Sequence, residues 1–246
     1  MKEAWIKAAL KITGDFEGGG YGSLAGNFDG QGVSAGILQW NLGQGTLQLL
    51  LGKYIVKFGP ISENIIFPES IDHLAFLDRT DAIAFAKANM LDGKNLRSDW
   101  ACCWKQFLRL KGCIEVQNDL ARITYGRRAY EAMDAWEMHS LRSFCFFFDV
   151  SVQNGSMRGI KPFDINAHEF WELMEAVPDE LKKHWEFITP TSEQMVLFVA
   201  GYRRSRKSKK PYQNDVLSRK ACIAMGRGLV HGKVYSLDIL DNINQS

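Results

Sequence analysis

The sequence contains few of the residues that crosslink or rigidify a chain. Its 246 residues include only 5 cysteines and 6 prolines. The cysteine number is odd, and the spacing fits neither a disulfide framework nor a C-x-x-C metal site. We therefore expect reduced cysteines that belong mainly to the core, namely Cys102, Cys103, Cys113, Cys145 and Cys222.

Long hydrophobic runs are also missing. The longest aromatic run, residues 144–148, is interrupted by Cys145, and it is far shorter than the roughly 20 apolar residues that cross a bilayer. Near the N-terminus, Glu3 and Lys7 stand where a signal peptide needs an unbroken apolar stretch. We expect no membrane span. The chain is expected to be made in the cytoplasm without a signal peptide, or to be a fragment of a larger protein.

Neither sign of charge predominates, since 30 Lys and Arg face 28 Asp and Glu and leave a net charge of +2. One basic stretch suits an anionic polymer, either nucleic acid or an acidic cell-wall glycan, or else forms a solvated loop after a helix. Nucleic-acid proteins usually have a broader basic face with interleaved aromatics, so no nucleic-acid partner is expected. The basic stretch consists of Arg203, Arg204, Arg206, Lys207, Lys209 and Lys210.

Motifs for metals and cofactors are absent from the sequence. The histidines have no H-E-x-x-H or similar ligand spacing, and there is no Gly-x-Ser-x-Gly elbow. Residues 226–231 contain half of a dinucleotide fingerprint, but they follow a helical pattern and lack the third glycine. We expect no metal site and no cofactor.

What the sequence does contain is helical periodicity, which predicts a mainly α (α+β) fold. Two helix starts have a capping pattern, Asn166 with Glu169 and Thr191 with Gln194. Without repeats or a convincing linker, one domain over residues 1–246 is expected, with two lobes that meet near residues 155–165. Helices are expected at residues 5–12 (ending at Gly14), 47–58, 81–88, 98–110, 116–133, 140–154, 167–175, from 191 into the basic stretch, and 216–225.

Between the first two expected helices lies a glycine-rich segment, residues 16–45, that favours short strands and tight turns. Glu17 stands beside Phe16, where partial burial would raise its pKa and suit it to act as a general acid. Asp29 lies in a turn sequence that would keep it ionised, as a general base requires. Ser34 would hold a water beside Asp29. On the residues alone, a helix-end Glu and an Asx-turn Asp with structural roles are the more frequent outcome.

Three motifs resemble the lysozyme-like superfamily. Residues 29–37, DGQGVSAGI, look like the chitosanase hairpin, in which the catalytic Asp begins an Asp-Gly-x-Gly-x-Thr-x-Gly motif. Residues 36–39 look like the Gly-x-x-Gln motif of goose-type lysozymes and lytic transglycosylases. Residues 148–155 are similar to a helix end that lines the far side of the chitosanase cleft. The resemblance implies a bilobal helical fold with a small β-hairpin that carries the catalytic Asp.

Carried onto this chain, the resemblance makes Glu17 the general acid and Asp29 the general base, with Ser34 in place of the family's water-holding Thr. Such a pair inverts the anomer when its carboxyl groups lie roughly 6.5–9.5 Å apart. For Trp40 core packing is an equal alternative, for Gln153 and Asn154 a helix C-terminal cap, and for His231 an ordinary loop position. The expected substrate-binding residues are Tyr21, Gln39, Trp40, Asn41, Gln153, Asn154 and His231. By contrast, a structural role and a buried partner are expected for Asp149.

The leading functional hypothesis is a monomeric muramidase that hydrolyses the β-1,4 bond between N-acetylmuramic acid and N-acetylglucosamine in peptidoglycan. Chitosanase and lytic transglycosylase activity are the alternatives, as is a non-catalytic glycan-binding or phage or secretion structural module. The resemblance extends to antibacterial secretion effectors, which would imply an immunity or inhibitor protein, and to phage endolysins. Either would act on the cell wall in the periplasm of a target or host bacterium.

Overall fold

The computed structural model describes residues 2–185 and 188–242. The chain forms two compact units, unit 1 with residues 1–16 and 124–246 and unit 2 with residues 17–123. It therefore leaves unit 1 immediately after Phe16 and returns at Thr124. The segment around residues 155–165, where the sequence suggested a meeting of two lobes, lies inside unit 1.

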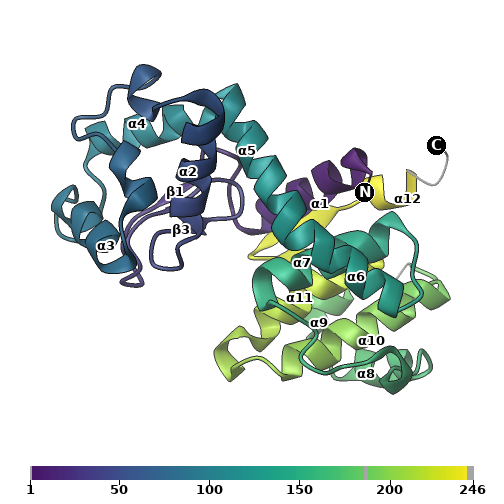
Figure 1. Ribbon diagram of the computed structural model, residues 1–246. Coiled ribbons are helices and arrows are strands. Elements are labelled where there is room, and N and C mark those ends of the chain that lie inside the picture. Colours follow the sequence, from purple (N-terminus) through teal and green to yellow (C-terminus); the bar gives the residue numbers. More distant parts are fainter. Residues whose placement is uncertain (1, 186–187, 243–246) are drawn as a thin grey trace. The chain divides into compact units, whose positions relative to one another are not determined.

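Unit 2 combines helices with a three-stranded antiparallel sheet in the order β1-β2-β3 (Figure 1). Helix α2 packs against η2, α5 and β3, and α4 packs against α5 and β1. Trp100, Trp104 and Phe107 of α4 are fully buried and form edge-to-face pairs in the core. The elements are β1 (Leu24–Ala25), β2 (Ser34–Ala35), β3 (Trp40–Asn41), α2 (Thr46–Phe58), η1 (Ile61–Glu63), η2 (Asp72–Phe76), α3 (Arg79–Ala88), α4 (Ser98–Arg109) and α5 (Lys111–Ala121).

Unit 1 is a helical body in which α7 packs against α1, α6 and α11, while α11 also packs against α10 and β4 (Figure 1). Nearly every side chain of α7 is buried, including Phe144 and Phe146 to Phe148. The elements are α1 (Glu3–Phe16), α6 (Arg127–Ala135), α7 (Leu141–Asn154), η4 (Pro162–Asp164), α8 (Glu169–Glu175), α9 (Asp179–Lys182), α10 (Ser192–Arg206), η5 (Lys210–Tyr212), α11 (Gln213–Met225), β4 (Arg227–Val230), β5 (Lys233–Ser236) and α12 (Ile239–Asn242).

The mainly α fold class predicted from the sequence is therefore confirmed. Helix α2 ends at Gly59, as predicted, and α7 begins after Ser140 with a capping box. The Thr191 cap is also confirmed, because its hydroxyl accepts from the amide of Gln194 and the Gln194 side chain accepts from the amide of Thr191. In the residues that the structure describes, no helix is long and apolar enough to cross a membrane.

Three local predictions differ from the structure, and one element was missed. Helix α1 continues through the buried Gly14 to Phe16. The predicted helix 116–133 begins five residues earlier and contains a π-helical turn, η3 (Arg122–Gly126). The hairpin β4–β5 was not predicted. At α8 the proposed cap is wrong: Asn166 accepts from the amide of His168, whereas Glu169 accepts two hydrogen bonds from the guanidinium of Arg203. Both carboxylate oxygens of Glu169 are therefore bound to a group of opposite charge.

None of the five cysteines forms a disulfide. Cys113, Cys145 and Cys222 are buried, Cys103 is half-buried and Cys102 is exposed. Burial raises the pKa of the Cys113 and Cys222 thiols to about 12, and it raises the pKa of Cys145 as well. These three therefore behave as apolar core residues rather than nucleophiles.

Candidate active site

The two carboxylates proposed for catalysis both belong to unit 2. Glu17 directly follows the last residue of α1 and is half-buried. Asp29 is exposed in the loop between β1 and β2. Its Oδ1 accepts a hydrogen bond of 3.0 Å from the amide of Gln31, which makes an Asx turn. Asp29 thus has an ordinary turn geometry and a carboxylate that water can reach.

The loop that carries Asp29 is closed at its base by Asn27, which is 6% exposed. Asn27 accepts from the amide of Gly32 at 2.8 Å and donates to the carbonyl of Gly93 at 2.9 Å. Gly30 and Gly32 have φ angles of 79° and 83°, which favour glycine. The buried side chain of Asn27 therefore closes the turn that presents Asp29 and anchors it to the segment at Gly93.

Ser34 is held by the neighbouring strand. The Nδ2 of Asn41 donates to Ser34 Oγ at 2.7 Å, and the two residues face each other in the β2–β3 register. Asn41 is buried, and its Oδ1 accepts from the amide of Gln44 at 3.1 Å. Because Ser34 accepts from Asn41, its hydroxyl proton is free to be donated elsewhere, for instance to a water.

The turn with the Gly-x-x-Gln pattern is fixed by a residue that the sequence did not single out. Gln117 of α5 is fully buried, accepts from the amide of Ile37 at 2.9 Å and donates to the carbonyl of Leu108 at 3.2 Å. Gly36 has a φ of 83°, and a Cβ there would lie 2.4 Å from Gln117 Oε1. Gln117 lies 80 positions after Ile37, so no local pattern reveals the contact.

The other predicted binding residues of unit 2 differ in exposure. Tyr21 and Gln39 are half-buried, whereas Trp40 is 3% exposed. The hydroxyl of Tyr21 donates to Asn118 at 2.6 Å. Gln39 has a φ of 52°, and its side-chain amide donates to the carbonyl of Gly36 at 3.1 Å. The burial of Trp40 is what the core-packing alternative requires.

The remaining predicted residues, Gln153, Asn154 and His231, belong to unit 1. Asn154 ends α7, and Gly155 follows with a φ of 76°. Gln153 donates to Asp215 at 2.7 Å, and His231 Nε2 lies 2.5 Å from the other oxygen of the same carboxylate. Asp215 therefore brings Gln153 and His231 together.

Asp149 lies at the centre of a buried charge cluster in unit 1, as its sequence position suggested. It is fully buried, accepts from Arg219 at 2.6 Å and pairs with the ammonium of Lys220, which also donates to Gln153 at 2.8 Å. Burial opposes the ionisation of Asp149, but the charges of Arg219 and Lys220 outweigh it and lower the pKa of this carboxyl to about 2. Burial also lowers the pKa of Lys220.

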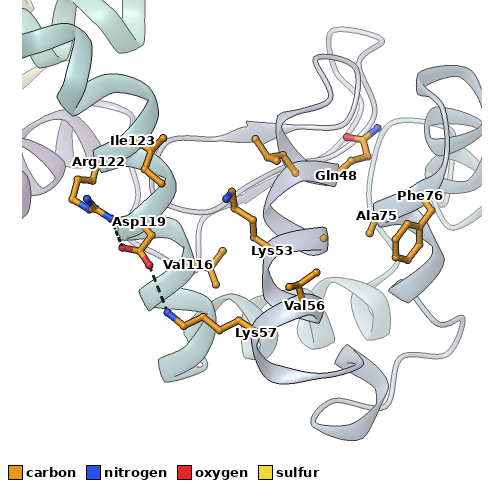
Figure 2. A pocket seen from close by; sticks show the side chains of 12 residues that line it. Gln48, Lys53, Val56, Lys57, Ala75, Phe76, Val116, Asp119, Arg122 and Ile123 are labelled. Atoms are coloured by element: carbon orange, nitrogen blue, oxygen red, sulfur yellow. Dashed lines mark hydrogen bonds and ion pairs between the residues drawn. The ribbon is translucent and has the colours of Figure 1, made fainter. Parts of the chain in front are cut away.

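A hollow of about 570 Å³ lies over α2, between α5 and η2 in unit 2, and contains none of the predicted residues (Figure 2). Its walls are mostly apolar, with Val56, Phe76 and Val116 among them. The one carboxylate in its lining, Asp119, is paired with Lys57 and Arg122. This hollow has no pair of carboxylates for acid–base chemistry. In the described part of the chain, no group of three or more His, Cys, Asp or Glu side chains is placed to hold a metal.

Comparison with solved structures identifies the fold. No family model and no curated protein matches the sequence. Among solved structures, the native chitosanase from Bacillus subtilis MY002 matches with a TM-score of 0.51 at 15% identity, covering 89% of this chain and 86% of that one. A point mutant of the same enzyme, complexed with 6 GlcN, matches with a TM-score of 0.52 and the same identity and coverage. The chain has the fold of a chitosanase.

At this identity the likeness establishes the architecture and not the activity. The chitosanase fold agrees with the lysozyme-like, mainly helical fold that the motifs implied, and with a β-element next to the first helix. The roles of the individual residues therefore depend on their chemistry and on direct tests.

Proposed function

We propose that the chain is a glycoside hydrolase that cleaves a β-1,4-linked hexosamine polymer by inverting acid–base chemistry. The observation that carries the proposal is the placement of Glu17 and Asp29. Glu17 directly follows α1, and Asp29 lies in the β1–β2 loop of a chain with the chitosanase fold. The half-burial of Glu17 and the exposure of Asp29 support unlike roles for the two groups, one as acid and one as base.

In this mechanism Glu17 protonates the bridging oxygen while the departing sugar gains oxocarbenium character. A water held by Asp29 and Ser34 attacks from the opposite face, so the anomer inverts. The anchored loop at Asn27 and the Asn41–Ser34 hydrogen bond support this assignment, because both fix groups that must not drift during proton transfer. Each acid–base group is worth about a hundredfold to ten-thousandfold in rate.

For the substrate we propose peptidoglycan, with chitosan as the second candidate. The Gly-x-x-Gln turn supports a muramidase, and the neighbour complexed with 6 GlcN supports a chitosanase. The basic stretch gives less support to an anionic cell-wall substrate than its charge suggests, because two of its arginines are engaged within the protein. Arg203 is paired with Glu169, and Arg204 is buried and donates to the carbonyl of Ser156.

One digest tests the proposal and separates the substrates. Wild type, Glu17→Gln and Asp29→Asn are incubated with purified peptidoglycan and with chitosan, and the products are resolved by mass spectrometry. Asn at position 29 can still accept from the amide of Gln31, so the turn is kept. We expect release of fragments from one polymer by the wild type and a loss of at least about a hundredfold in both variants.

Glu175→Gln and Asp92→Asn are the matched controls. Glu175 is exposed at the end of α8, and Asp92 forms a similar turn by accepting from the amide of Lys94 at 2.9 Å. Both controls should retain full activity. Full activity of Glu17→Gln would refute the assignment. Products with 1,6-anhydro ends would indicate a transglycosylase, and tight binding without any fragments would favour a non-catalytic module.

A further inference from the structure

The C-terminal end of α1 is held by side chains from other parts of unit 1. His231 Nδ1 lies 2.9 Å from the carbonyl oxygen of Phe16, and the hydroxyl of Tyr235 donates to the carbonyl of Asp15 at 3.0 Å. The rings of Tyr235 and Phe16 pack edge-to-face, and the guanidinium of Arg219 lies over the ring of Phe16. The last carbonyls of a helix have no partner within it, so these contacts replace the missing hydrogen bonds.

His231 occupies a position that its own backbone does not favour. Val230 pairs with Lys233, so His231 and Gly232 form a two-residue hairpin turn, with φ angles of 49° and 76°. Turns with two positive φ angles favour Asn-Gly, because Asn and Gly adopt this conformation at little cost. Histidine is less favoured than Asn at the first position, so the turn itself does not account for His231. The contacts of its side chain do.

That side chain bridges α1 to the polar network of α11. Its Nδ1 faces the carbonyl of Phe16 and its Nε2 faces a carboxylate oxygen of Asp215. Asp215 is in turn fixed by Gln153, which Lys220 holds. The carbonyl of Phe16 is thereby tied to the buried cluster around Asp149.

We propose that His231 is a positioning residue for Glu17, an inference that rests on the proposed function. The carbonyl of Phe16 and the amide N–H of Glu17 belong to one planar peptide group. A ring that fixes the oxygen therefore fixes the direction in which the chain enters Glu17 and the placement of its Cα. In this role His231 acts through Phe16 and does not touch the sugar, unlike the substrate contact expected from the sequence.

The test is the variant His231→Asn, with His168→Asn as the control. Asn suits the turn but is too short to bridge Asp215 and Phe16, so the substitution removes the bridge and keeps the turn. We expect kcat to fall about 10- to 100-fold with KM nearly unchanged, since a misplacement of about 1 Å in a catalytic group costs rate on this scale. His168 is exposed at the start of α8, and its replacement should leave both constants unchanged.

Each outcome decides the inference. A raised KM with unchanged kcat would make His231 a substrate contact, and unchanged constants would make it a surface residue; both overturn positioning. If His231→Asn lacks the native circular dichroism spectrum, His231→Gly, which also suits the turn, takes its place, and unfolding of both variants would show a purely structural role. Activity in Glu17→Gln would refute the proposed function itself. An inactive Glu17→Gln beside a fully active His231→Asn would refute this inference alone.

Discussion

The side-chain amide of Asn41 donates to the hydroxyl of Ser34 at 2.7 Å, between directly paired positions of β2 and β3. Asn41 is buried, so its amide has little access to water as a substitute partner. The contact joins a residue assigned to hold the attacking water to the framework of the small sheet. It also means that the Ser34 hydroxyl has two separable functions, one as acceptor and one as donor.

Replacing Ser34 should affect both stability and catalysis. Ser34→Ala leaves a buried amide without its acceptor, which should destabilise the fold by about 1–3 kcal/mol, and it removes the group that orients the water. We expect a loss of kcat/KM of at least tenfold. Ser34→Thr keeps the hydroxyl and suits a strand, so its kcat/KM should stay within about threefold of wild type. An alanine variant as active as the threonine variant would exclude the water-holding role.

Gly36→Ala should destabilise the protein strongly. The residue has a φ of 83°, and a new Cβ would lie 2.4 Å from the buried Gln117 Oε1. A strained backbone costs about 1–3 kcal/mol by itself, and the displaced Gln117 adds to that. Urea unfolding measures the change. Gly20→Ala, where the φ lies outside the left-handed region and no atom lies within 4 Å of the new Cβ, is the matched control and should change little. Equal effects of the two substitutions would contradict the role of Gln117.

Acid stability should depend on Asp149. Its folded-state pKa of about 2 lies below the ordinary value, so the unfolded chain takes up the proton first as the pH falls. The stabilisation is therefore complete above about pH 4 and is lost as the pH approaches 2. Urea unfolding at several pH values between 6 and 2.5 measures the decline.

The variant Asp149→Asn should be less stable at neutral pH by about 3–5 kcal/mol, because it leaves Arg219 and Lys220 buried without their carboxylate. Its stability should also fall less steeply between pH 4 and 2.5, since the titrating group is gone. A decline as steep as that of the wild type would show that other carboxyls control the acid transition.

Gly52→Ala should stabilise the protein. Gly52 lies within α2 and lines the hollow of Figure 2, and a Cβ there would meet only the Cβ of Ala75, at an ordinary 3.9 Å. Alanine in a helix interior is favoured over glycine by about 0.5–1 kcal/mol. Gly155→Ala provides the contrast: space is equally open there, but the φ of 76° should make alanine destabilising. Thermal midpoints of both variants test this, and a lowered midpoint for Gly52→Ala would contradict it.

The features that could be predicted from the sequence are those that neighbouring residues determine. Apolar spacing and the Gly59 stop located α2, and the Thr191–Gln194 pair located the start of α10. The Asp29 turn follows from its own glycines and from Asn27. These elements depend on contacts within a few positions, where periodicity and capping chemistry are informative.

The features that could not be predicted depend on distant residues. Arg203 binds Glu169, which lies 34 positions earlier and therefore does not complete the Asn166 cap. Gln117 contacts the turn at Ile37, which lies 80 positions earlier. The hairpin of β4 and β5 has His231-Gly232 where Asn-Gly would have signalled a turn. His231 itself was predicted to bind substrate, but its contact with Phe16 spans 215 positions and is visible only in the folded chain.

The distribution of the thiols has a practical consequence. Cys113, Cys145 and Cys222 are enclosed, burial raises the pKa of the half-buried Cys103, and Cys102 stands exposed on α4. A maleimide dye should therefore attach to the native protein first at Cys102, without any engineered cysteine. Since none of the five cysteines is crosslinked, a reducing agent can be used before labelling, and removed before the dye is added, without altering the fold.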